Sequence, residues 1–110
     1  MVTQTPKIFA QQYPAAGIDT NLFTVLSGHN AQLTVFVANH SPNEDSISVA
    51  LVPQGTANTT PPNYIAYQTR ILGNGCVAFS GLFLDDGDQV RVTSAAGTSS
   101  FVASGVDITA

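Results

Sequence analysis

Apolar and polar residues alternate along most of the chain, with a period of two that is typical of β-strands. Residues 46–51 alternate Ser or Ala with Ile, Val or Leu, which predicts a strand with one buried face. Residues 31–39 differ, because Phe36 and Ala38 make the second face apolar as well. Such a pattern is typical of a central strand, or of a strand covered by a neighbouring subunit. No window shows a convincing helical period.

Turn-forming residues interrupt the alternation about every ten residues, and the chain lacks internal repeats and linkers. The pattern predicts eight strands, at residues 7–13, 22–26, 31–39, 46–51, 64–67, 76–84, 89–95 and 100–109. Strands at this spacing are typical of an all-β, antiparallel β-sandwich, either a jelly roll or an Ig-like fold. We expect residues 1–13 to form an extended N-terminal arm, and residues 14–110 to form a single sandwich domain.

Two local signals refine this prediction. Residues 54–62 are polar and contain two consecutive prolines, which cannot donate to a β-ladder, so we expect an exposed loop there. Gly81 interrupts the strand at 76–84 and marks a possible β-bulge.

Charged residues are scarce in this sequence of 110 residues. They make up 9 %, against about 25 % in ordinary globular proteins, although the hydrophobic content of 44 % is ordinary. Three basic residues face seven acidic ones, and the net charge of −4 argues against nucleic acid as a partner. Because free domains usually depend on surface charge for solubility, we expect neighbouring subunits to cover part of this surface.

Signals for compartment are mainly absences. The sequence contains no apolar run of transmembrane length and no recognisable signal peptide, so we expect no membrane partner. Cys76 is the single cysteine, which excludes an internal disulfide and fits a reducing cytosol. We interpret it as a buried thiol that packs like a small hydrophobic residue.

No catalytic or metal-binding motif emerges. The acidic cluster Asp85, Asp86 and Asp88 lacks the ligand spacing of a calcium loop, and its Asp-Gly step is typical of a hairpin turn. His29 and His40 stand in turn contexts, where we expect solvated loop histidines rather than zinc ligands or partners of Cys76. We therefore predict no enzyme activity and no cofactor.

Aromatic and aliphatic side chains are the strongest candidates for contacts with other proteins. Tyrosine suits an interface because it combines a large apolar area with one polar tip. Tyr64 and Tyr67 could alternatively form a sugar-stacking platform, although the chain has no tryptophan, the best stacking surface. The candidate subunit-interface residues are Ile8, Phe9, Tyr13, Phe36, Tyr64 and Tyr67.

Several phrases, in order, resemble a family of small virion proteins of tailed bacteriophages. LFTVLSGHNAQLTVFVANHS is similar to the opening of that family, and SISVALVPQG to its strand ending in Val-Pro-x-Gly. NYIAYQTRILGNG is similar to its Tyr-Ile-Ala-Tyr segment, GLFLDDGDQVRV to its Gly-Asp hairpin, and FVASGVDI to its closing strand. The resemblance spans residues 22–109. The chain departs from it at Leu26, where the family has proline, and in its acidic turn at 43–45.

The resemblance implies a non-enzymatic structural protein of a phage particle, assembled in the cytoplasm of the bacterial host. It favours a capsid cement or decoration protein, with a neck, tail or baseplate component or a carbohydrate-binding host-recognition module as the alternatives. The implied partners are the major capsid protein or tail and neck proteins, together with further copies of this chain, for which family analogy favours a homotrimer. The arm at 1–13 could add a strand to the open sheet edge of a neighbour.

Overall fold

A computed structural model describes residues 3–56 and 59–109 of the chain. These residues form eight β-strands and one turn of 3₁₀ helix, η1 (Pro61–Asn63), and contain no α-helix. The strands are β1 (Thr3–Gln12), β2 (Thr20–Thr24), β3 (His29–Asn39), β4 (Asp45–Val52), β5 (Tyr64–Ile71), β6 (Cys76–Leu84), β7 (Gln89–Ser94) and β8 (Ser99–Thr109). No helix in this part of the chain has the length and apolar character needed to cross a bilayer.

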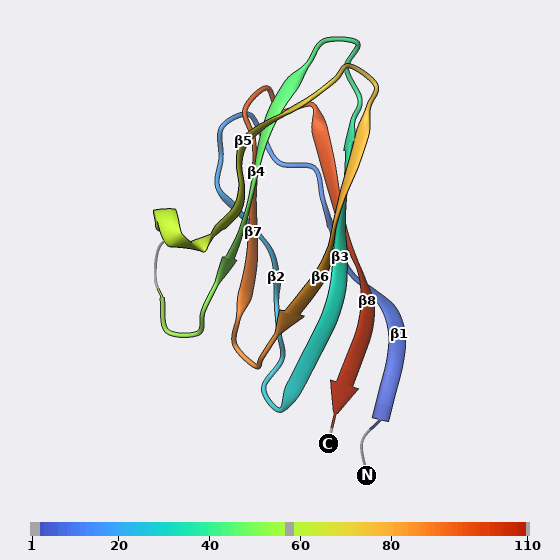
Figure 1. Cartoon of the computed structure of the whole chain (residues 1–110), viewed down its shortest axis with the longest axis vertical. Helices are drawn as coiled ribbons and strands as arrows, with labels where there is room; N and C mark the ends of the chain where they lie inside the picture. Colours follow the sequence, from blue (N-terminus) through green and yellow to red (C-terminus); the bar gives the residue numbers. More distant parts are fainter. Residues whose placement is uncertain (1–2, 57–58, 110) are drawn as a thin grey trace.

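The strands form two four-stranded sheets that pack face to face (Figure 1). The first sheet has the order β1-β8-β3-β6 and the second the order β2-β7-β4-β5, and every neighbouring pair is antiparallel. Except for β4 and β5, consecutive strands lie in different sheets. This winding is that of a jelly roll. The predicted all-β antiparallel sandwich is therefore confirmed. Of the two predicted folds, jelly roll and Ig-like, the strand order is that of the jelly roll.

The strand positions agree closely with the alternation in the sequence, and β6 has the predicted bounds. The expected bulge also occurs: Gly81 has a φ of +74°, and the pairing of β3 with β6 shifts opposite it. A left-handed backbone at Asn74, with a φ of +56°, forms part of the turn between β5 and β6. Residues 57 and 58 of the predicted 54–62 loop lie outside the described residues.

The segment expected to be an extended N-terminal arm contributes a strand to the sandwich. Thr3–Gln12 is extended, and it pairs with β8 of the same chain from Thr3 opposite Thr109 to Gln12 opposite Phe101. Phe9 turns inward at a register shift and packs against Phe23 of β2, with ring centroids 4.7 Å apart. A neighbouring chain could therefore add a strand to this segment only along the edge of β1 that β8 does not use.

The Asp85–Asp88 turn corrects one prediction. It is a tight turn, in which the Asp88 N–H donates to the Asp85 carbonyl at 3.2 Å and Gly87 has a φ of +78°. However, it connects β6 in the first sheet to β7 in the second, so the predicted hairpin is wrong. Alternation and turn chemistry identify two strands and a sharp bend, but they do not specify whether the two strands pair with each other.

The core lies between the two sheets and consists of aliphatic side chains around a single fully buried aromatic ring, Phe101. Every strand from β2 to β8 contributes at least one buried residue to it. Because the inward residues alternate with outward ones, the remaining side chains of each strand lie on the two outer surfaces of the sandwich.

Candidate functional site

The outer surface of the first sheet is built from aligned rows of side chains. One row runs from Pro6 through Val106 and Gln32 to Phe83. We call the outward side of this sheet the outer face. Its apolar residues include Pro6, Ile8, Phe36, Phe83, Val102 and Val106. Its polar residues include Gln4, Gln11, Gln32, Thr34, Ser100 and Ser104.

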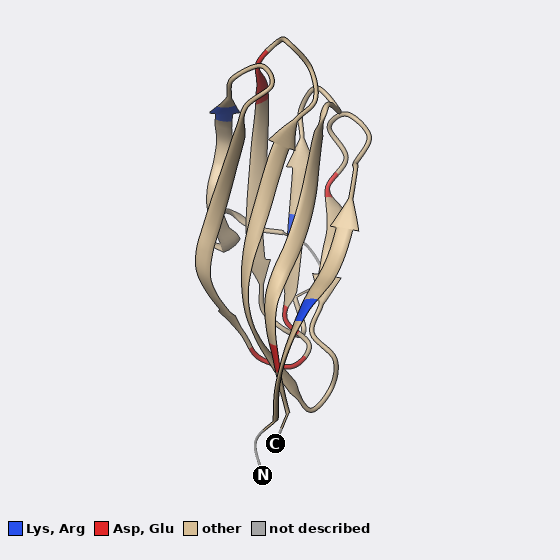
Figure 2. Cartoon of the chain, turned by 90° about the vertical axis from the view of Figure 1, so that its right-hand side faces the viewer, with Lys and Arg blue, Asp and Glu red and all other residues tan. Residues whose placement is uncertain are grey.

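The four strands that form the outer face all lie within the described residues, and none of their outward side chains is charged. The strands β1, β8, β3 and β6 contain only two charged residues, Lys7 and Asp107 (Figure 2). Asp107 lies opposite Ala31, which is buried, so its side chain faces the interior of the sandwich. Lys7 faces the same way, because it pairs with Gly105, which in turn lies opposite the buried Leu33.

Both inward charges are partnered. The Asp107 carboxylate lies 2.9 Å from Nδ1 of His29 and 3.8 Å from Nζ of Lys7. His29 is thus the first residue of β3 and pairs with a carboxylate, which corrects the prediction of a solvated loop histidine. Sequence spacing could not reveal this contact, because the two residues meet through the pairing of β3 with β8.

The other cationic side chains belong to the second sheet. Arg91 on β7 contacts Asp19 at 3.2 Å, and Arg70 on β5 donates to Glu44 at 2.6 Å. The hydrogen bond and the charge of Glu44 raise the pKa of Arg70. The two sheets therefore differ in their charged groups: the second presents ion pairs to the solvent besides the exposed Ile65 and Tyr67, and the first presents aliphatic, aromatic, amide and hydroxyl groups.

Several large apolar side chains on the outer face are exposed to solvent. Ile8 is 60 % exposed, Phe36 49 % and Phe83 69 %. Phe36 and Phe83 extend from neighbouring strands, β3 and β6, and Ile8 extends from β1. Exposed apolar side chains that share one face in this way are typical of a protein-binding surface.

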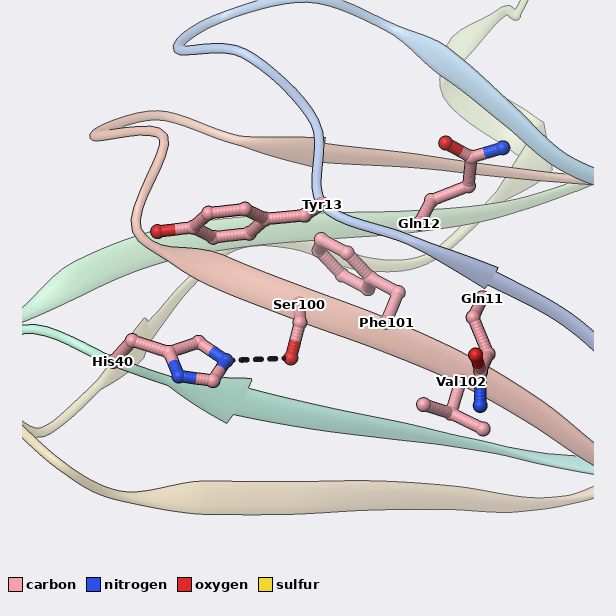
Figure 3. A pocket seen from close by; sticks show the side chains of 7 residues that line it. All are labelled: Gln11, Gln12, Tyr13, His40, Ser100, Phe101 and Val102. Carbon is pink, nitrogen blue, oxygen red and sulfur yellow. Dashed lines mark hydrogen bonds between the residues drawn. The ribbon is translucent and has the colours of Figure 1, made fainter.

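A hollow of about 560 Å³ lies at one end of the outer face (Figure 3). Tyr13 and His40 form its wall, with their rings edge to face and 5.5 Å between centroids. His40 stands just after the end of β3, in the turn that the sequence predicted. Its Nε2 nevertheless has a partner, because it lies 2.8 Å from the hydroxyl of Ser100. A hydrolytic triad needs a third group that orients the imidazole. Within the described residues, Ser100 is the one side-chain hydrogen-bond partner of His40.

The structure separates the predicted interface residues into three groups. Ile8 and Phe36 lie together on the outer face, with Tyr13 at the hollow beside it. Phe9 points the other way and packs into the interior. Tyr64 and Tyr67 lie on β5 in the second sheet, away from the others.

The two tyrosines of β5 border a second hollow, of about 530 Å³, together with Thr59 and Pro61. Their rings are 4.8 Å apart and inclined at 63° to each other. Rings at this angle do not form one flat surface.

Sequence reasoning missed Phe83 and misplaced Cys76. Phe83 alternates with the buried Leu82 and Leu84, so the period of two contained the signal for an outward aromatic residue. Cys76 was expected to be buried, but it is exposed. It lies opposite Ala38, on the outward side of β6, the edge strand of the first sheet. Its position in an edge strand, which has no neighbour on one side, explains the exposure.

The described residues contain no cluster of three or more histidine, cysteine or acidic side chains that could hold a metal ion. The chain matches no protein-family model, and no curated protein sequence is significantly similar to it.

Proposed function

We propose that this protein is a structural subunit that works by binding other protein subunits through the outer face. The observation that carries the proposal is the chemistry of that face, which combines exposed apolar side chains with a lack of charged side chains on the outward side of its four strands. The core of a protein interface is typically depleted in charged residues and enriched in aromatic ones. This face contributes to the low charge content of the chain as a whole.

Within this class, we propose a virion structural protein of a tailed phage, and a capsid cement or decoration protein in particular. The support for this finer assignment is the resemblance of residues 22–109 to such proteins. The jelly roll adds an analogy at the level of the fold, because many viral capsid domains have this fold. Lectins and other unrelated proteins have it too, so the fold alone does not identify the function. A neck, tail or baseplate position is the alternative.

Such a subunit needs no catalytic group. Its mechanism is to provide a rigid body, in which the packed sandwich holds the outer face in a fixed shape. A preorganised surface loses little conformational entropy when it binds, so contact area is converted efficiently into affinity.

The test is the amount of this protein in purified phage particles, measured by quantitative mass spectrometry. Hundreds of copies per particle would place it in the shell, and a few to dozens would place it in the neck or tail. Its absence from particles would overturn the virion assignment. Binding of the purified protein to particles that lack it should be weakened by Phe36→Asp, whereas Ile65→Asp, which adds the same charge to the second sheet, should have little effect.

A further inference from the structure

We propose that the outer face binds a second copy of this chain, so that two first sheets pack face to face around a two-fold axis. This inference rests on the proposed role as an assembly subunit, and it names the partner and the surface. The three arguments for it are the absence of charge on the face, its area, and the symmetry that a single face allows.

Charge is the first argument. In a two-fold interface the same patch meets itself, so any charged residue near the axis faces its own copy and is repelled. The outer face is free of that penalty, because Lys7 and Asp107 both lie on the opposite side of the sheet. Its polar side chains are amides and hydroxyls, which can both donate and accept hydrogen bonds. Such groups can pair with the identical group of a second copy.

Area is the second argument. β3 and β8 have eleven residues each. At about 3.3 Å per residue and about 4.8 Å between strands, the outer face is roughly 36 Å long and 19 Å wide. Its flat area is on the order of 700 Å², before the relief of the side chains is counted, and each partner in a standard stable interface contributes about 800 Å². One such face is therefore large enough to hold a dimer together.

Symmetry is the third argument. A ring of three copies needs two different surfaces on each subunit, which contact each other head to tail. The outer face is one continuous surface, and the outward side of the second sheet has ion pairs at Arg70 and Arg91. Pairing of like with like through the outer face therefore produces a dimer, in contrast to the homotrimer that family analogy favours.

The decisive experiment compares two isosteric substitutions by sedimentation velocity over a dilution series. Gln32→Glu adds a charge to the middle of the outer face, between Val106 and Phe83. Gln68→Glu makes the same change at an exposed position on β5 of the second sheet, and serves as the control. We expect the unsubstituted protein and the control to be dimers, and Gln32→Glu to raise the dissociation constant about tenfold or more.

A second pair of variants tests the apolar contribution and guards against misfolding. Phe36→Asp removes a half-exposed ring from the outer face, and Ile65→Asp does the same to a similarly exposed side chain of β5. Far-UV circular dichroism establishes that each variant is folded. Loss of the dimer in Phe36→Asp alone supports the proposal. A monomer or trimer in the unsubstituted protein, or a dimer that is equally stable in all four variants, would overturn it.

Failure of this inference is distinguishable from failure of the proposed function. A monomer that is nevertheless present in purified particles would leave the structural role intact and remove the face-to-face dimer. A dimer that is sensitive to Gln32→Glu but absent from particles would leave the dimer intact and remove the virion assignment.

Discussion

The hydroxyl of Ser99 donates a hydrogen bond of 2.6 Å to the carboxylate of Asp45, and so joins the two sheets of the sandwich. Ser99 begins β8 in the first sheet and Asp45 begins β4 in the second. The same carboxylate accepts a 2.5 Å hydrogen bond from Ser94 and two further bonds from the N–H groups of Ser46 and Ala96. Asp45 is 3 % exposed, so this is a buried carboxylate with four donors.

We expect Asp45→Ala to lower the free energy of unfolding by about 3 kcal/mol, because it leaves buried donors without an acceptor. Chemical denaturation measures the change. Asp45→Asn, which keeps the size and one acceptor oxygen, should cost less. A loss below about 0.5 kcal/mol in the alanine variant, the usual size of a surface effect, would mean that the four hydrogen bonds contribute little.

The hydrogen bonds to Asp45 also allow a prediction of how the stability of the protein depends on pH. Burial by itself raises the pKa of this carboxyl group, but the bonds from Ser94, Ser99 and the two N–H groups lower the pKa below its ordinary value of 3.8. A lowered pKa in the folded state stabilises the protein above the unfolded value, and this contribution is lost as the pH falls from there through the folded value. Thermal unfolding from pH 7 to pH 2 should therefore show a decline below about pH 4. The decline should be shallower in Asp45→Asn, and equal slopes in both proteins would contradict the assignment.

Truncation of two adjacent residues of β1 should have very different effects on the free energy of unfolding. Phe9→Ala removes a ring that packs on Phe23 and the core, and we expect it to lower the free energy of unfolding by about 3 kcal/mol. Ile8→Ala removes an exposed side chain and should change it by less than about 0.5 kcal/mol. Chemical denaturation of both variants, at a protein concentration low enough to dissociate any oligomer, measures the two changes in the free energy of unfolding. Equal losses would mean that β1 does not keep its register.

Gly105 of β8 should not tolerate a side chain. A Cβ atom there would lie 2.1 Å from the carbonyl oxygen of Gln32 and 2.7 Å from Cα of Leu33, and both are backbone atoms of β3. We expect Gly105→Ala to cost about 3 kcal/mol or to prevent folding, because the two strands must separate to admit the methyl group. Ser104→Ala on the outward side is the matched control. Thermal melting curves of the two variants provide the measurement.

Removal of divalent cations should leave the melting temperature unchanged. The acidic turn before β7 already uses its carboxylates within the chain: Asp88 accepts hydrogen bonds from the N–H groups of Gln54 and Asp85, and Asp85 accepts one from Asp86. Melting curves with and without a chelator test this expectation. A clear drop on chelation would indicate a calcium site at 85–88.

Much of the fold could be predicted from the chain because alternation is a local property. The period of two located all eight strands, and β6 to the residue, since each strand has one face in the core. The double apolar pattern of residues 31–39 predicted a central strand or one covered by a neighbouring subunit, and β3 does lie between β8 and β6, with Phe36 facing out. The bulge at Gly81 was equally predictable, because left-handed backbone favours glycine.

What the sequence alone determined is therefore the list of strands, their two faces and the scarcity of charge. Only the tertiary structure decided which strands are neighbours, and that depends on contacts between residues far apart in the chain. The pairing of β8 with both β1 and β3 placed Ile8, Phe36 and Val106 on one uncharged surface and turned Lys7 and Asp107 away from it. The pairing of β3 with β8 also brought His29 to Asp107. The packing of the two sheets brought Ser99 to Asp45, because in a jelly roll almost every consecutive pair of strands is divided between the two sheets.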